Sequence, residues 1–217
     1  MIINYKSFIL LLRKNIRTLI LFEIIFIFSL IVYFIYSPKI FEAYFEISNA
    51  EIYNQNGYWD TIVPALDIKR SLQNPLGFSS TLVTQCMGDD LNLNRKVLAN
   101  SLNINPMQGG KRLGIAVRLE GVKNTENCAN LILNSLINEL NISLISLAAK
   151  SMPNFDTQQS SAAIPEDKIK RAYVALPVRM SDGYVKPDLL KLLLLGVVTG
   201  LFAAFFYIQL KAKYGEQ

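Results

Sequence analysis

The sequence contains no histidine, so the side chain most often used as a general base or metal ligand near neutral pH is missing. It has two cysteines among 217 residues, too few for a thiolate-based zinc cluster. Gly109-Gly110-Lys111 lacks the spacing of a phosphate-binding loop and predicts a turn instead. Asp89-Asp90 is more typical of a helix start than of paired catalytic carboxylates. We therefore expect a protein that is not an enzyme and has no catalytic residues, metal site or cofactor.

Excess positive charge is confined to the two ends of the chain. The 22 Lys and Arg outnumber the 17 Asp and Glu, but residues 39–188 hold 15 of each sign. Residues 1–17 contain four basic side chains and no acid. A nucleic-acid-binding domain would carry its basic excess on the folded part. The distribution argues against nucleic acid as a partner and indicates cytoplasmic flanks of membrane spans.

Two long apolar runs cover residues 18–36 and 189–210. The second has 22 residues, and a helix of that length extends about 33 Å, enough to cross a hydrocarbon core of about 30 Å. The first is longer than the core of a signal peptide, and no small-x-small cleavage site follows it. We therefore predict two transmembrane helices in a lipid bilayer, cytoplasmic segments 1–17 and 211–217, and one domain outside the cytoplasm over residues 37–188.

The two predicted spans contain polar and small residues with distinct expected roles. Glu23 lies about one turn inside the first span, and an acid in a membrane is a functional candidate. It could instead pair with Arg17, with a neighbouring subunit or with lipid headgroups. Gly196, Gly200 and Ala204 place a small residue at every fourth position of the second span. They predict a ridge that another helix can approach closely, either from a second copy or from the first span.

Prolines and cysteines mark the predicted external domain. Pro177 and Pro187 precede the second span, where their fixed φ and missing N–H favour an extended or kinked entry that orients the span. In an oxidising compartment, a bridge between Cys86 and Cys128 would close a loop of about 40 residues and contribute roughly 3–4 kcal/mol. The alternative is two separate buried thiols, because spacing alone does not fix the distance between them.

Periodicity predicts an α+β domain between the spans, with a sandwich-like packing of helices against a sheet. Alternating apolar residues indicate strands at 39–52, 112–120 and 169–178. A 3.6-residue repeat indicates an amphipathic helix over 125–150, whose asparagines make one face too polar for a third span. Residues 151–165 read as a loose connector.

Several polar residues are suited to begin helices in this domain. Ser79 and the pair Asp89-Asp90 precede apolar helical patterns, and the helix after this pair is expected to continue to Leu102. Asn124 or Thr125 is expected to cap the long amphipathic helix.

With these features, the chain resembles the Wzz-type chain-length determinants, also called polysaccharide co-polymerases. The resemblance rests on a proline-led entry into the first external strand, an alternating strand followed by a helix, and a proline segment before a glycine-bearing span. The matching segments are Pro38-Lys-Ile-Phe-Glu-Ala43, Leu113 to Glu120, Cys128-Ala-Asn-Leu-Ile-Leu-Asn134, Ala172 to Pro177, Pro187, Gly196 and Gly200.

The resemblance implies a non-catalytic protein of the bacterial inner membrane, with both termini cytoplasmic and the central domain periplasmic. It implies a ring-like homo-oligomer that sets the chain length of a surface polysaccharide: O-antigen of lipopolysaccharide, capsule or exopolysaccharide. The implied partners are a membrane polysaccharide polymerase and the growing polysaccharide. The external segment is shorter than is usual in the family, and the seven residues after Leu210 leave no room for a fused tyrosine kinase.

Two other functions are consistent with the sequence. One is a transmembrane activator of a separate cytoplasmic tyrosine kinase in capsule export, which suits the short external domain. The other is a two-pass sensor in which residues 37–188 bind a small molecule. A sensor requires a cytoplasmic output module, and the sequence predicts none.

Overall fold

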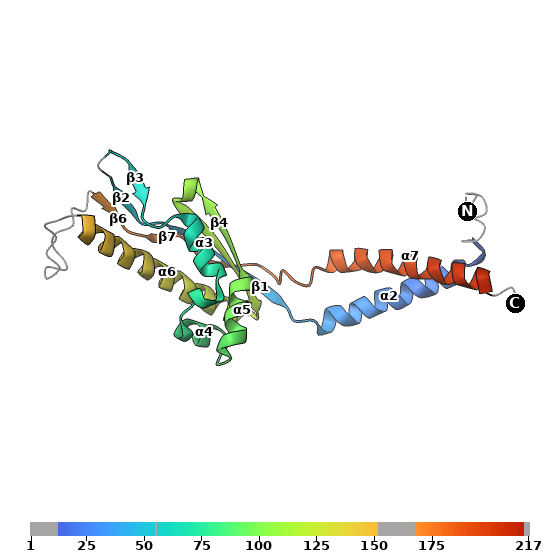
Figure 1. The fold of residues 1–217 in the computed structure, drawn as a ribbon. Coiled ribbons are helices and arrows are strands. Elements are labelled where there is room, and N and C mark those ends of the chain that lie inside the picture. Colours follow the sequence, from blue (N-terminus) through green and yellow to red (C-terminus); the bar gives the residue numbers. More distant parts are fainter. Residues whose placement is uncertain (1–12, 55, 152–167, 215–217) are drawn as a thin grey trace. The chain divides into compact units, whose positions relative to one another are not determined.

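The computed structural model describes residues 13–54, 56–151 and 168–214. The chain divides into two compact units, shown in Figure 1. One contains the chain up to Lys39 and from Lys186 onward, and the other is Ile40–Val185.

The first unit is a pair of long helices in mutual contact, α2 (Ile16–Tyr36) and α7 (Leu189–Tyr214). Most of their large apolar side chains are exposed, and α2 has no buried residue. At the end of α2, Lys39 donates a hydrogen bond to the Phe34 carbonyl oxygen, with its Nζ 3.8 Å from the Phe34 ring centroid. A cation at this position also interacts favourably with the helix C-terminus.

The second unit is built on an antiparallel sheet with strand order β4-β5-β1-β7. Its strands are β1 (Ile40–Ser48), β4 (Leu102–Met107), β5 (Arg112–Glu120) and β7 (Tyr173–Met180). In the β1–β5 register, Ala43 lies opposite Val117 and Phe45 opposite Ile115. These four side chains are at least nine-tenths buried, and they form the sheet side of the hydrophobic core.

Helices supply the other side of that core. The long helix α6 (Val122–Ser151) contacts β1, β5 and β7, and Figure 1 shows it lying along the sheet. Three short helices complete the layer: α3 (Ala65–Gln73), α4 (Ser80–Met87) and α5 (Leu91–Ser101). A small second sheet and two 3-10 turns join these elements: β2 (Glu51–Tyr53), β3 (Trp59–Thr61), β6 (Ile169–Lys170), η1 (Pro75–Gly77) and η2 (Gln108–Gly110). The predicted α+β class is confirmed by this arrangement.

By length and composition, three helices in the described part of the chain could cross a membrane, one more than the sequence predicted. They are Ile16–Tyr36, Val122–Ala148 and Leu189–Lys211. The additional candidate belongs to α6, which buries one face in the core of the second unit. Asn130, Asn134 and other polar residues lie on its exposed face. The mean hydropathy of this candidate is 1.5, lower than the 2.6 and 2.3 of the two terminal helices.

Two local details differ from the expectations. Helix α5 ends at Ser101, one residue before the predicted Leu102, and the edge strand β4 that follows it was not predicted. Helix α6 begins at Val122, so Thr125 lies inside its first turn; its buried hydroxyl donates to the carbonyl oxygens of Gly121 and Leu119. The predicted connector at 151–165 lies almost wholly outside the described residues.

Candidate functional site

The small residues of α7 form a buried stripe that faces α2. Gly196, Gly200 and Ala204 are all buried, although most of the helix around them is exposed. A Cβ atom at Gly196 would overlap the end of the Leu30 side chain on α2. The structure thus places the predicted ridge against the first helix of the same chain, and the absent side chains allow this close approach.

Glu23 of α2 occupies the notch at Gly200. A Cβ atom at Gly200 would lie 3.0 Å from the Cδ and both carboxylate oxygens of Glu23. Both oxygens are shielded from solvent, and in the described part of the chain neither has a hydrogen-bond partner. The predicted alternative of a pair with Arg17 is therefore not formed within this copy. A buried acid without a partner is unfavourable. We therefore expect that a side chain added at Gly200 would disturb its contact with Glu23.

The two predicted span-orienting prolines lie in different units. Pro177 is inside β7, an edge strand whose register with β1 shifts around Glu46. Pro106 occupies the opposite edge strand, β4. A proline cannot donate to a further strand, so each edge has a position that discourages strand addition. Pro187 directly precedes Asp188, the residue before α7.

Asp188 caps the first turn of α7. Its Oδ1 accepts hydrogen bonds from the backbone N–H groups of Leu190 and Lys191, and its Oδ2 lies 3.2 Å from Lys191 Nζ. The backbone hydrogen bond from Lys191 is the main cause that lowers the pKa of Asp188 below its ordinary value of 3.8. The ionised carboxylate is thus the form that stabilises the helix start.

We expect Asp188→Ala to increase severalfold the hydrogen exchange of the Leu190 and Lys191 amides, relative to their intrinsic rates. Because the folded pKa is lowered, the stabilisation is present above pH 3.8 and lost as pH falls through the folded pKa. Asp188→Asn keeps an acceptor but cannot titrate, so it should retain protection without this pH dependence. Equal exchange in the intact chain and Asp188→Ala would contradict the cap.

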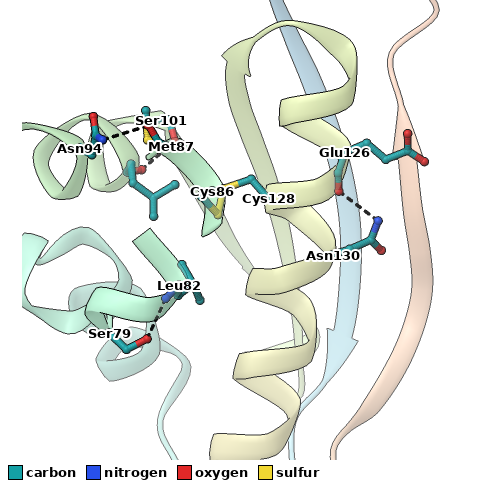
Figure 2. Close-up of a disulfide and its surroundings, with 10 residues drawn as sticks. Ser79, Leu82, Cys86, Met87, Asn94, Ser101, Glu126, Cys128 and Asn130 are labelled. Atoms are coloured by element: carbon teal, nitrogen blue, oxygen red, sulfur yellow. Dashed lines mark hydrogen bonds between the residues drawn. A yellow bond between two sulfur atoms is a disulfide. The ribbon is translucent and has the colours of Figure 1, made fainter. Parts of the chain in front are cut away.

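A disulfide joins α4 to α6. Figure 2 shows Cys86 of α4 bonded to Cys128 of α6, with a Cα–Cα distance of 4.8 Å. The sequence had left open a bridge or two separate thiols, and the structure contains the bridge. Both residues are buried in the core. The bridge therefore fixes a short peripheral helix to the helix that covers the sheet.

Hydrogen bonds fix both ends of α4, the short helix that contains Cys86, as Figure 2 shows. Ser79 Oγ accepts from the Leu82 N–H at the start of α4, as its predicted capping role requires. Asn94 Nδ2 donates to the Met87 and Gly88 carbonyl oxygens at the end of α4. These hydrogen bonds restrict the conformations of α4, the helix that the disulfide joins to α6.

The described residues offer little support for a catalytic cavity. A hollow of about 230 Å³ lies between α3 and α6, lined by residues that include Ser71, Leu72, Leu136 and Glu139. Typical ligand pockets measure about 300–1,000 Å³. Within residues 13–54, 56–151 and 168–214, no group of three or more acids, cysteines or histidines is placed to hold a metal ion.

Sequence reasoning missed an ion-pair network around one buried acid, Glu51, at the start of β2. Glu51 is 6% exposed and lies 3.4 Å from Lys111 Nζ and 3.2 Å from Lys170 Nζ. It connects the start of β5 with the strands β2 and β6. The sequence does place Glu51 within an alternating strand pattern, which could have indicated a buried acid. It could not identify the partners, because Lys111 and Lys170 are far away in the sequence.

A second missed feature is a tyrosine packed across the open face of the sheet. Tyr44 donates a hydrogen bond of 2.9 Å to Glu46 Oε1, and Gly114 leaves room for its ring, since a Cβ there would lie 2.5 Å from the Tyr44 hydroxyl. Burial, followed by this hydrogen bond, raises the pKa of Tyr44. Only the register between β1 and β5 reveals this packing.

No protein-family model and no curated protein matches the sequence. Solved structures with a similar fold include a full-length bacterial polysaccharide co-polymerase, with a TM-score of 0.51 and 8% sequence identity. The match covers 98% of this chain and 99% of that chain. The resemblance inferred from the sequence is therefore confirmed at the level of the fold, across both units.

Proposed function

We propose that this chain is a non-catalytic polysaccharide co-polymerase that regulates the chain length of a bacterial surface polysaccharide. The observation that carries the proposal is the fold match over 98% of the chain, which includes the terminal helices as well as the α+β unit. The proposed role requires a scaffold for a polymerase, and it assigns no bond-making step to this protein.

In this proposal α2 and α7 are the two spans and α6 is not one. Helix α6 contributes Ile132, Leu136 and Leu140 to the core of the second unit and is joined to α4 by the disulfide. Insertion of α6 into a bilayer would remove it from this core and from the helix to which the disulfide joins it. The exposed apolar surfaces of α2 and α7 are instead suited to lipid.

The topology follows from charge and redox chemistry. The basic segment 1–17 favours a cytoplasmic N-terminus, and two spans return the C-terminus to the same side. The disulfide is suited to an oxidising compartment, which supports a periplasmic location for the second unit and an inner-membrane location for the protein.

Several surfaces are available for a ring-like homo-oligomer and a membrane polymerase. Because Pro106 and Pro177 interrupt the two sheet edges, copies are expected to associate through helices and loops, without extending the sheet. In the membrane, Leu194, Phe202 and Phe206 on α7 are more than half exposed and can contact a second copy or the polymerase.

The test is electrophoresis of surface polysaccharide from cells with and without the gene. We expect a narrow modal band in the intact strain and a random ladder after deletion, with the band restored by a plasmid copy. The detergent-purified protein should have the mass of a large homo-oligomer.

An unchanged length distribution after deletion would reject chain-length control. Loss of capsule together with altered tyrosine phosphorylation would favour the kinase-activator function.

A further inference from the structure

Aromatic side chains gather on the hairpin formed by β2 and β3, at the end of the second unit where β1 finishes. Tyr53 is 41% and Tyr58 is 70% exposed. Trp59 is partly buried, and its ring contacts that of Tyr53 edge to face, with centroids 5.3 Å apart and an interplanar angle of 62°. We call Tyr53, Tyr58 and Trp59 the aromatic hairpin.

One lysine, Lys170, lies over the Trp59 ring, and a second, Lys111, pairs with the same acid, Glu51. Lys170 Nζ lies 4.0 Å from the Trp59 ring centroid and 3.2 Å from Glu51 Oε2. Lys111 Nζ lies 3.4 Å from Glu51 Oε1. The Glu51 side chain is 9% exposed, whereas the two lysine side chains are 51–53% exposed. An ammonium group has three donors, so each lysine keeps donors for a ligand after it contacts Glu51.

Hydrogen bonds from one asparagine order the hairpin turn. Asn54 Oδ1 accepts from the backbone N–H groups of Asn56 and Tyr58, and its Nδ2 donates 2.6 Å to Asp60 Oδ2. The Asn54 N–H also donates to the Tyr58 carbonyl oxygen. Gly57 has a φ of 85°, which suits glycine at this turn. These hydrogen bonds hold the backbone of Tyr58 beside Asn54 before a ligand binds, which lowers the entropy lost on binding.

The chemistry of this surface is suited to a sugar ring. The faces of aromatic rings carry negative charge density and attract the polarised C–H groups on one face of a pyranose. Lysine, asparagine and aspartate side chains around the rings supply hydrogen-bond donors and acceptors for hydroxyl or carboxylate oxygens. The exposed rings of the hairpin are tyrosines, which combine an apolar face with a polar tip.

We propose that the aromatic hairpin binds saccharide units of the surface polysaccharide, stacking them on its rings and hydrogen-bonding them through Lys111 and Lys170. This inference rests on the proposed function, which supplies a polysaccharide as the ligand. It locates the contact with the polymer on Tyr53, Tyr58 and Trp59 and on the two lysines.

Trp59 makes the proposal directly measurable, because it is the single tryptophan of the chain. The full-length protein in detergent is titrated with short oligosaccharides obtained by partial hydrolysis of the surface polysaccharide of the same cells, while tryptophan emission is recorded. We expect a saturable change in emission. Tyr58→Ala should weaken the apparent affinity by about 3–10-fold, the loss of one aromatic contact.

A matched control is Tyr184→Ala, which removes a tyrosine that is 41% exposed, like Tyr53. Tyr184 precedes Val185, whose N–H donates to the Ile40 carbonyl oxygen at the opposite end of β1. Tyr184→Ala should leave the affinity unchanged, whereas Tyr53→Ala should weaken it. Emission that does not change with any oligosaccharide, or equal effects of Tyr53→Ala and Tyr184→Ala, would overturn the proposal.

Electrophoresis of the polysaccharide separates failure of this inference from failure of the proposed function. If gene deletion broadens the length distribution but purified protein shows no saturable emission change, the hairpin proposal is wrong and chain-length control stands. If saturable binding depends on Tyr58 but deletion leaves the distribution unchanged, the hairpin is supported and chain-length control is rejected.

Discussion

Replacing Gly200 by leucine is expected to separate helices α2 and α7 and to abolish the narrow polysaccharide length distribution. Even a Cβ atom at this position would lie 3.0 Å from the carboxylate of Glu23. A leucine adds further atoms to a buried contact, and overpacking of this kind costs about 1–3 kcal/mol. That cost corresponds to roughly a 5–150-fold shift of the helix-pairing equilibrium.

Crosslinking measures the pairing directly. Phe22 and Tyr207 have ring centroids 5.4 Å apart, so Phe22→Cys and Tyr207→Cys place two thiols for a short bifunctional reagent. The crosslinked fraction should fall severalfold in Gly200→Leu. Val198→Leu adds bulk at a position of α7 that is 42% exposed and should have no effect.

A second substitution should partly reverse the effect of Gly200→Leu. Glu23→Ala removes the carboxylate that the leucine displaces and makes room at the same point of the helix pair. Crosslinking in Glu23→Ala with Gly200→Leu should therefore exceed that in Gly200→Leu alone. If Gly200→Leu and Val198→Leu crosslink equally well, the close approach at Gly200 is not required.

Loss of the disulfide is expected to have the largest effect on the stability of the second unit. The bond joins residues 42 apart in sequence, and closure of a loop of this length contributes roughly 3–4 kcal/mol. For a domain of this size, that corresponds to a decrease of about 6–16 °C in Tm. The measurement is thermal unfolding of the full chain in detergent before and after reduction.

Alanine substitution provides the control for reduction. Cys86→Ala with Cys128→Ala removes both thiols without leaving a polar group in the core, where Cys128 is fully buried. Its Tm should lie close to that of the reduced protein and should not respond to reductant. An intact chain whose Tm is unaffected by complete reduction would contradict a stabilising bridge.

Strong periodicity made some elements predictable from the sequence. The alternation from Arg112 to Glu120 predicted the bounds of β5, since its large apolar side chains all face the core: Leu113, Ile115, Val117 and Leu119. Helix α7 begins at Leu189, where a continuous apolar run follows Pro187 and Asp188, and this change in composition marked its start in the sequence. The pair Asp89-Asp90 was predicted to begin a helix, and the structure shows Asp90 Oδ1 accepting a hydrogen bond from the Leu93 N–H. In each case the deciding interaction lies within a few residues.

Elements that depend on distant partners were not predictable. Strand β4 contains Pro106 and follows a helical pattern, and only its pairing with β5 makes residues 102–107 a strand. The hairpin strands β2 and β3 have three residues each, too few for a clear pattern. Likewise, the spacing of Gly196 and Gly200 indicated a close helix contact, but tertiary structure was needed to place α2 against it.

The most direct test of chain-length control is the polysaccharide length distribution in a deletion strain complemented with the intact chain or with Gly200→Leu. We expect a narrow modal band with the intact chain and a random ladder with Gly200→Leu at equal protein levels in the membrane. A narrow band in the uncomplemented deletion strain would contradict chain-length control by this protein.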